Sequence, residues 1–187
     1  MRRDNAAYSL VILPPKEDWG PFVEIKKNHM NPKIKRPPFP HITLLGSLNP
    51  DEIDLVGPLV SDCEPFDLEI SSFKVFENKN NSTLYLDPKE DLNNNADNMR
   101  AIHRRLSDGG LRTRDFEPHI GIAFCDSVKQ ANALRDKYQN GFPVIRFRVT
   151  HVYVMKRNGE TDPFEPFRAI ALKGCENIKP KNEVVVK

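Results

Sequence analysis

One short pattern occurs twice in this chain, and it constrains the fold more than any other feature. Residues 38–46 are PFPHITLLG, and residues 116–124 are FEPHIGIAF. His41 and His119 thus share one frame of Pro, His, Ile, a variable residue and an aliphatic residue, 78 positions apart (119 − 41). A motif repeated in this way predicts a pseudo-twofold structure in which the two histidine strands occupy equivalent places and face one groove.

The elements expected around the two motifs follow one coarse order in each half: strand, helix, histidine strand, helix. Apolar or alternating runs predict strands, and apolar stripes at helical spacing predict helices. The strands are expected at residues 8–13, 41–45, 66–76, 83–86, 119–124, 145–155 and 168–172, and the helices at residues 18–30, after Asp51, before Gly109 and after Ser127. A change of phase at Ser71-Ser72 also predicts a bulge in the third strand.

No linker interrupts this pattern, so one domain is expected. Residues 1–175 are predicted to form a mixed α+β domain, because strands and helices alternate along the whole stretch. The Lys-rich segment 176–187 is predicted to be a frayed tail. A chain of 187 residues can bury enough surface in one domain to need no disulfide or metal for stability.

The repeated motif suggests acid–base chemistry. Residues two apart on a strand point the same way, so His41 shares a face with Thr43, and His119 shares one with Gly121. Two imidazoles across a groove can divide proton work, since an ordinary histidine pKa of about 6.5 permits both roles near neutral pH. A hydroxyl such as that of Thr43 can donate a hydrogen bond to a phosphoryl oxygen. The pattern therefore indicates phosphodiester chemistry without a metal.

Four stretches of the chain resemble the two-histidine (2H) phosphoesterase superfamily, which includes RNA 2′,3′-cyclic phosphodiesterases and 2′-5′ RNA ligase-like proteins. They are PFPHITLLGSL, FEPHIGIAF, the opening YSLVILPP and the closing VYVMKRNGETDPFEPFRAIAL. The similarity in layout runs from about residue 6 to residue 173. It implies a bilobal fold of two antiparallel sheets with flanking helices around a central cleft, with no metal and no cofactor. It also implies that His41, Thr43 and His119 occupy catalytic positions.

One residue departs from the pattern of this superfamily. The second motif should carry Thr or Ser where this chain has Gly121, so one phosphate-binding hydroxyl is missing. Such a donor to a charged oxygen contributes about 1–3 kcal/mol. Another donor replaces it, the site is slow, or the protein binds its ligand without cleaving it.

Basic residues precede both motifs. Residues 26–36 contain five Lys or Arg and no acid, and residues 100–114 contain five Arg and one acid. Arg36 and Arg114 lie nearest the two motifs and are candidate substrate-binding residues. The net charge of +2 carries no such information, but the paired placement favours an anionic substrate such as RNA or a nucleotide over two merely solvated faces.

The remaining histidines and the tyrosines are assigned to the bulk of the fold. His29 is expected to be exposed, His103 half-buried and His151 a satisfied core histidine. Tyr8, Tyr85 and Tyr153 are each able to stack on a base, but core packing is the default interpretation for each.

The cysteines and the hydrophobic pattern indicate an intracellular setting. Cys63, Cys125 and Cys175 are odd in number and far apart, which argues against a disulfide framework and a structural zinc site. The apolar run at 8–13 is too short for a signal sequence or a membrane span. We expect a monomer in the cytoplasm or nucleus that does not contact a membrane.

Two classes of function fit these features. The first is a metal-independent phosphoesterase that hydrolyses an RNA or nucleotide phosphodiester involving the ribose 2′-oxygen, either a 2′,3′-cyclic phosphate or a 2′,5′ linkage. The second is a degenerate member of the superfamily that binds RNA ends or phosphorylated nucleotides without turnover. Gly121 favours the second class, and the intact His41, Thr43 and His119 favour the first.

Overall fold

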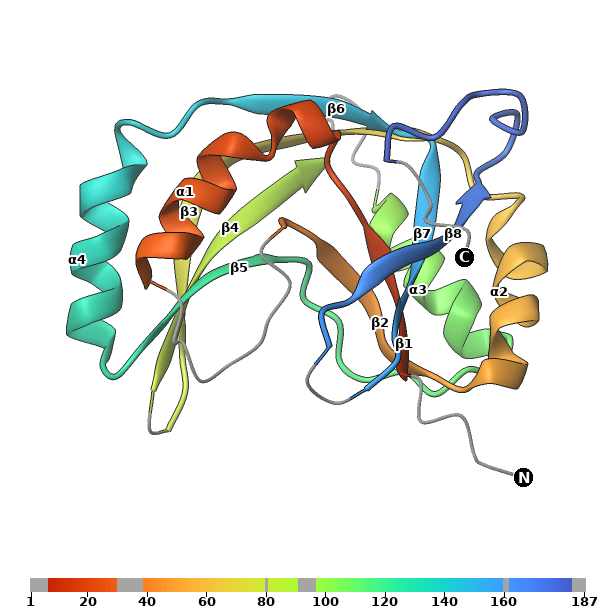
Figure 1. Ribbon diagram of the computed structural model, residues 1–187, viewed down its shortest axis with the longest axis horizontal. Helices are drawn as coiled ribbons and strands as arrows, with labels where there is room; N and C mark the ends of the chain where they lie inside the picture. The colour runs from red at the N-terminus through yellow and green to blue at the C-terminus, as the bar shows by residue number, and fades with distance from the viewer. Residues whose placement is uncertain (1–6, 30–38, 80, 91–96, 160–161, 183–187) are drawn as a thin grey trace.

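The computed structural model describes residues 7–29, 39–79, 81–90, 97–159 and 162–182. Within them lie eight strands and four α-helices (Figure 1). Their bounds are β1 Ala7–Ile12, α1 Gly20–His29, β2 Ile42–Leu48, α2 Ile53–Val60, β3 Phe66–Glu77, β4 Ser82–Glu90, α3 Asn98–Asp108, β5 Ile120–Cys125, α4 Val128–Gln139, β6 Ile145–Val149, β7 His151–Arg157 and β8 Glu165–Ala171. None of these helices is long and apolar enough to cross a membrane.

The strands form two sheets, and each motif strand lies at the edge of one of them. The first sheet has the order β2-β1-β7-β8, and the second has the order β5-β4-β3-β6. Every pair of neighbouring strands is antiparallel. The predicted α+β class with two antiparallel sheets is confirmed, and β2 and β5 occupy equivalent edges as the repeated motif predicts.

Two helices each pack against the sheet that does not contain the strand before them. Helix α1 follows β1 of the first sheet but packs against β5 of the second. Helix α3 follows β4 of the second sheet but packs against β2 of the first. With α4 on the second sheet and α2 against α3 and β8, the helices form two groups on opposite sides of the view in Figure 1. Each lobe is therefore built from both halves of the sequence.

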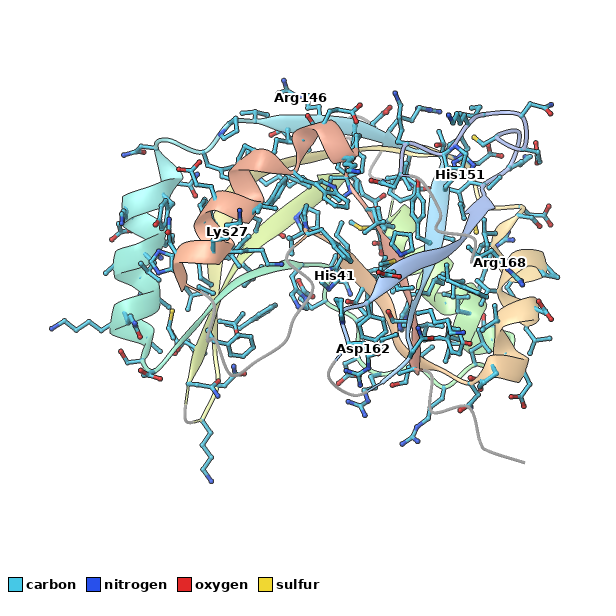
Figure 2. All side chains as sticks on the ribbon, in the orientation of Figure 1. Lys27, His41, Arg146, His151, Asp162 and Arg168 are labelled. Carbon is cyan, nitrogen blue, oxygen red and sulfur yellow. The ribbon has the colours of Figure 1, made fainter. Side chains whose placement is uncertain are left out.

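The segment 145–155 differs from its prediction as one continuous strand. It breaks at Thr150 into β6, which pairs with β3 of the second sheet, and β7, which pairs with β1 of the first. Arg146 on β6 and His151 on β7 accordingly lie well apart in Figure 2. All residues from His151 to Met155 are buried, because β7 is an inner strand with packed side chains on both faces. Alternation in the sequence does not reveal such a change of sheet.

Both motif strands carry a bulge at the same position. In β2, Thr43 pairs with Val11 and Leu45 pairs with Leu10, which leaves Leu44 as the extra residue. In β5, Gly121 pairs with Tyr85 and Ala123 pairs with Leu84, which leaves Ile122 as the extra residue. Each extra residue stands three positions after the histidine, and each bulge turns two successive apolar side chains inward. The predicted bulge at Ser71 in β3 is also present, since the register shifts between Ile70 and Ser72.

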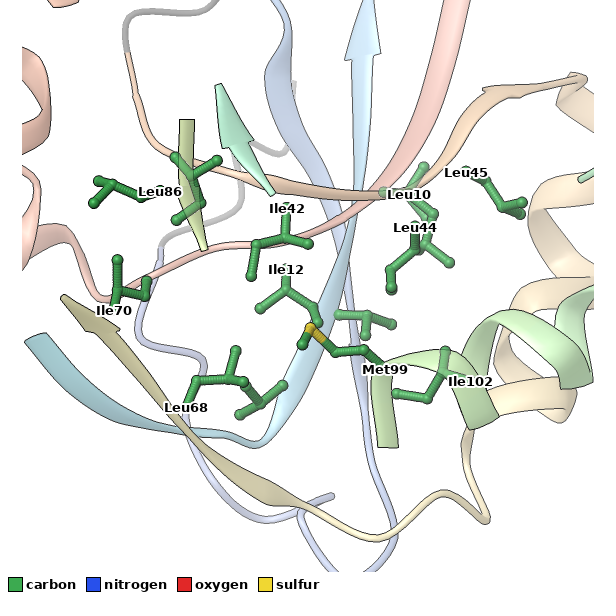
Figure 3. Close-up of a cluster of buried hydrophobic side chains, with 14 of the residues drawn as sticks. Leu10, Ile12, Ile42, Leu44, Leu45, Leu68, Ile70, Leu86, Met99 and Ile102 are labelled. Carbon is green, nitrogen blue, oxygen red and sulfur yellow. The ribbon is translucent and has the colours of Figure 1, made fainter. Parts of the chain in front are cut away.

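A single apolar cluster joins the two sheets. Ile42 and Ile120, which follow the two histidines, are both 0% exposed within it. Figure 3 shows residues of both sheets and of α3 in contact there, among them Leu10, Ile12, Leu68, Ile70, Leu86, Met99 and Ile102. Because successive strand residues alternate in direction, burying these isoleucines turns the histidines to the opposite face.

Asn182 anchors the C-terminal segment to the first sheet. Asn182 is 2% exposed, its backbone N–H donates to the Tyr153 hydroxyl at 3.4 Å, and its side-chain amide donates to the Pro14 carbonyl at 3.1 Å. Cys175 is also buried. A buried amide thus holds residue 182 against the first sheet, whereas residues 176–179 are exposed; the frayed tail expected for residues 176–187 stays a prediction.

Candidate active site

His41 is held at the start of β2 by its own main chain. Its Nδ1 lies 3.3 Å from the carbonyl oxygen of Phe39, two residues earlier. The same carbonyl accepts a hydrogen bond of 3.2 Å from the buried Lys26 ammonium. The Phe39 ring also contacts the imidazole edge-on, with 5.8 Å between centroids. In Figure 2 His41 lies near the middle of the molecule.

His119 is held in the same way at the start of β5. Its Nδ1 lies 2.7 Å from the carbonyl oxygen of Glu117, again two residues earlier. A carbonyl oxygen only accepts, so Nδ1 carries the proton in both rings and the neutral imidazole keeps its lone pair on Nε2. The proline between each carbonyl and its histidine restricts the backbone there. The repeated Pro-His thus fixes both imidazoles through Nδ1 in the same way, with the proton on Nδ1.

Two aromatic rings form a wall beside His119. Phe76 and Tyr85 stack with 3.9 Å between their centroids and 12° between their planes. His119 meets Phe76 edge-to-face at 5.2 Å and Tyr85 at 5.9 Å. These rings come from β3 and β4, so the second sheet itself fixes the orientation of the imidazole.

Gly121 leaves open space on the same face of β5. No heavy atom of the described residues lies within 4 Å of the position that a Cβ would take. Among the described residues, the glycines with positive φ are Gly110 and Gly174, so the backbone at Gly121 does not require glycine. A side chain is therefore tolerated there on both counts, and the missing hydroxyl is a chemical difference rather than a backbone necessity.

Residues of both motifs line one hollow of about 400 Å³. Thr43 contributes from β2, and His119 contributes from the start of β5. The other lining residues are Leu44, Leu45, Gly46, Ser47, His103, Arg112, Arg114, Asp115, Phe116 and Glu117. His41 and Gly121 are not among them, although each shares a strand face with a residue that is. Arg36, the other basic candidate, lies outside the described residues.

Helix α3 contributes residues to the candidate site that the two motifs do not predict. Arg100 donates to the Phe116 carbonyl at 2.6 Å and to the Glu117 carboxylate at 2.8 Å, so it holds the segment leading to His119. His103 stacks on Phe116 at 4.6 Å. A second hollow of about 590 Å³ continues along this helix, past Arg100 and Arg104. The spacing of Arg100, His103 and Arg104 places them on one helix face, which was a signal available in the sequence.

A profile of the 2′-5′ RNA ligase superfamily matches residues 14–161 of this chain. The chain belongs to this superfamily. The matched range contains both Pro-His-Ile motifs, the two motif strands β2 and β5, and all residues that line the hollow of about 400 Å³. The predicted resemblance to the two-histidine phosphoesterases is confirmed by this match.

Solved structures show the fold of this 2′-5′ RNA ligase superfamily member. The apo form of E. coli LigT has a TM-score of 0.57 and 15% identity, over 91% of this chain and 99% of LigT. Its complex with 3′-AMP has a TM-score of 0.59 and 15% identity, over 89% and 98%. Its complex with NADP⁺ has a TM-score of 0.59 and 16% identity, over 89% and 97%. No curated protein sequence matches the chain.

The three other histidines of this superfamily member lie away from the motifs or at the edge of the hollow. His29 is half-buried and its Nε2 lies 2.7 Å from the Tyr138 hydroxyl, so the expectation that it is exposed is wrong. His103 is half-buried, and His151 is buried with Nδ1 2.9 Å from the Thr150 hydroxyl, both as expected. Burial lowers the pKa of all three below the ordinary histidine value.

The cysteines and acidic residues offer no metal cluster in the part of the chain that is described. Cys63, Cys125 and Cys175 are free and buried, and burial raises the pKa of each thiol. No group of three or more His, Cys, Asp or Glu side chains in the described ranges is placed to hold an ion.

Proposed function

We propose that this protein is a phosphoesterase that acts on an RNA or nucleotide phosphodiester involving the ribose 2′-oxygen, with His41 and His119 as the general acid and base. The observation that carries the proposal is the matched hydrogen bond from each Nδ1 to the carbonyl two residues earlier. It places the proton on Nδ1 of both rings, so Nε2 is the nitrogen that would take up or donate the transferred proton in a paired mechanism. The mechanism requires that both Nε2 atoms face one phosphate across the cleft.

A 2′,3′-cyclic phosphate illustrates the reaction. The neutral imidazole takes a proton from water through Nε2 as the water oxygen bonds to phosphorus. The bond from phosphorus to one ribose oxygen breaks, and the protonated imidazole of the other motif gives its Nε2 proton to that oxygen. The Thr43 hydroxyl donates a hydrogen bond to a non-bridging oxygen. With a 2′,5′ linkage, the neighbouring 3′-hydroxyl or water is the nucleophile at the same site.

The surroundings of the hollow support an anionic ligand. Arg112 and Arg114 are exposed at its edge, and we assign Arg114 to substrate binding together with Arg36. The superfamily match and the nucleotides bound in E. coli LigT, 3′-AMP and NADP⁺, support a nucleotide or RNA substrate. We also propose that the protein works in the cytoplasm or nucleus, since its three cysteines are free thiols, and that it acts as a monomer.

Binding without turnover is the alternative that one observation favours. Gly121 lacks the hydroxyl that would complete the second motif, and its position is open. In that case the protein would hold a phosphorylated RNA end between the two imidazoles and release it unchanged.

Turnover assays in EDTA decide between the two functions. We expect the wild-type protein to hydrolyse at least one member of a panel of 2′,3′-cyclic mononucleotides, RNA with a 2′,3′-cyclic end and 2′,5′-oligoadenylate. His41→Ala and His119→Ala should each lower the rate by about 10²- to 10⁴-fold. The matched control is His29→Gln, because His29 bonds Tyr138 away from both motifs and its loss should leave turnover unchanged.

Each outcome has a clear meaning. No turnover of any panel member, with retained binding of RNA ends, would establish the binding function instead. Turnover that survives both alanine substitutions would remove the histidines from the mechanism. A bell-shaped dependence of kcat/KM on pH, with one limb lost in each histidine variant, would support the paired acid and base.

A further inference from the structure

Tyr85 stands directly beside the position where the second motif lacks its hydroxyl. It lies on β4, the strand between β5 and β3 in the second sheet (Figure 1). Its register partner on β5 is Gly121. Directly paired residues of antiparallel strands project on the same face of the sheet. The phenol therefore leaves the sheet on the face that carries His119.

The ring does not serve to cover the glycine. An aromatic residue opposite a glycine commonly lies over it and shields the bare backbone. Here no heavy atom of the described residues comes within 4 Å of the Cβ position at Gly121. The Tyr85 ring instead stacks on Phe76 and meets His119 edge-to-face at 5.9 Å. Its orientation thus follows the histidine, and no described residue other than the chain neighbours of Gly121 occupies the gap into which a ligand oxygen would fit.

The Tyr85 hydroxyl has no hydrogen-bond partner among the described residues. It is not sealed from solvent, even though the residue as a whole is 6% exposed. The charges acting on it are those of Lys74, Asp87 and Glu117. Glu117 supplies the carbonyl that holds His119, so the hydroxyl lies toward the motif end of the strands.

The phenol keeps its proton at neutral pH. Burial raises the pKa of Tyr85 above its ordinary value of 10, against a smaller opposite effect of Lys74. Because solvent reaches this O–H, water can accept its hydrogen bond in the unliganded protein. A ligand oxygen in the adjacent gap would replace that water as the acceptor.

We propose that the Tyr85 hydroxyl donates to a non-bridging phosphate oxygen of the substrate and so replaces the hydroxyl that is absent at Gly121. The assignment rests on the proposed function in assuming that the phosphate lies between the two motif histidines. The phenol only donates a hydrogen bond, and its proton is not transferred. This hydrogen bond makes Tyr85 a substrate-binding residue of this chain. Its side chain is longer than that of a Thr at position 121.

Removing the hydroxyl alone tests this assignment. Tyr85→Phe keeps the ring, its stack on Phe76 and its contact with His119, so the fold should be unchanged. We expect kcat/KM for a 2′,3′-cyclic mononucleotide to fall about 10- to 100-fold, the effect of one hydrogen bond to a charged oxygen. Binding of 3′-AMP, measured by calorimetry, should also weaken. Tyr8→Phe is the matched control, because Tyr8 is also 6% exposed but lies on the first sheet.

A rescue variant separates the proposed role from a structural one. Threonine fits at position 121, so adding Gly121→Thr to Tyr85→Phe should restore at least tenfold of the lost kcat/KM, about one hydrogen bond. A double variant as impaired as Tyr85→Phe, or a Tyr85→Phe protein equal to wild type in turnover and binding, would overturn the assignment.

Failure of the enzyme proposal gives a different result. A wild-type protein that binds 3′-AMP but hydrolyses no panel member contradicts the proposed turnover. Binding measurements alone then test whether the Tyr85 hydroxyl contacts the phosphate. Weaker 3′-AMP binding by Tyr85→Phe than by Tyr8→Phe supports the assignment in that case, and equal binding overturns it. A wild-type protein that neither binds nor hydrolyses these compounds overturns both proposals.

Discussion

Replacing His119 by alanine and by asparagine separates the two nitrogens of its ring. The alanine variant loses the Nδ1 hydrogen bond to the Glu117 carbonyl, which contributes about 0.5–1.5 kcal/mol. It also loses two edge-to-face contacts with Phe76 and Tyr85, each about 0.5–1.5 kcal/mol. An asparagine amide can occupy the place of Nδ1 and keep the first of these interactions. We therefore expect the free energy of unfolding of His119→Asn to exceed that of His119→Ala by about 1 kcal/mol.

Activity should not follow this ranking. Neither side chain has a titratable nitrogen at the position of Nε2, so both variants should lose about 10²- to 10⁴-fold in turnover. Urea unfolding at pH 7 and hydrolysis of a 2′,3′-cyclic nucleotide measure the two effects on the same preparations, and equal m-values would show that the unfolded states are comparable. If the two variants are equally stable, the Nδ1 bond does not hold the ring. If asparagine retains more than a tenth of the activity, Nε2 is not the reacting atom.

Three further changes have defined outcomes. Burial lowers the pKa of His151 below 6.5, so its contribution to stability is present above pH 6.5 and is lost as the pH falls below that value. His151→Gln should therefore make the free energy of unfolding depend less on pH between pH 7 and 5, and an unchanged pH dependence would contradict this. Arg114→Gln should weaken binding of an RNA oligonucleotide and reduce its log-log salt slope by about 0.7, whereas Arg135→Gln on α4 should do neither; equal slopes would exclude Arg114 from phosphate contact. Gly121→Thr alone should raise the free energy of unfolding by about 0.5–1 kcal/mol in urea titrations, because glycine weakens a strand and the added side chain has room; a loss would show hidden strain there.

The sequence revealed the parts of the site that depend on local pattern. The Pro-His frame, the strand alternation that buries Ile42 and Ile120, and the bulge at Ser71 all follow from neighbouring residues. The bulges after the two histidines were not visible, because two adjacent apolar residues such as Leu44 and Leu45 also suit an ordinary buried strand.

The rest of the site depends on contacts between distant segments. Tyr85 and Gly121 are brought together by a strand register, and no periodicity in the sequence encodes which residues become partners. His29 was expected to be exposed, yet its partner Tyr138 lies 109 residues away. The stretch around Thr150 alternates without a break, so nothing local shows that the chain leaves one sheet there and enters the other. In each of these cases, contacts between distant segments determine the arrangement.

The order of strands in the two sheets has a consequence for synthesis on the ribosome. The second sheet is made from the contiguous residues 66–149, whereas the first combines β1 and β2 with β7 and β8 from the far end of the chain. About a hundred residues separate β2 from β7, so at roughly 5–20 residues per second the nascent β1–β2 pair waits about 5–20 s for its partner. During this interval β1 exposes an unpaired edge and an apolar face, while β3, β4 and β5 of the second sheet can already pair with one another. The N-terminal strands are thus where a chaperone would bind the nascent chain, and where stalled or truncated chains would aggregate.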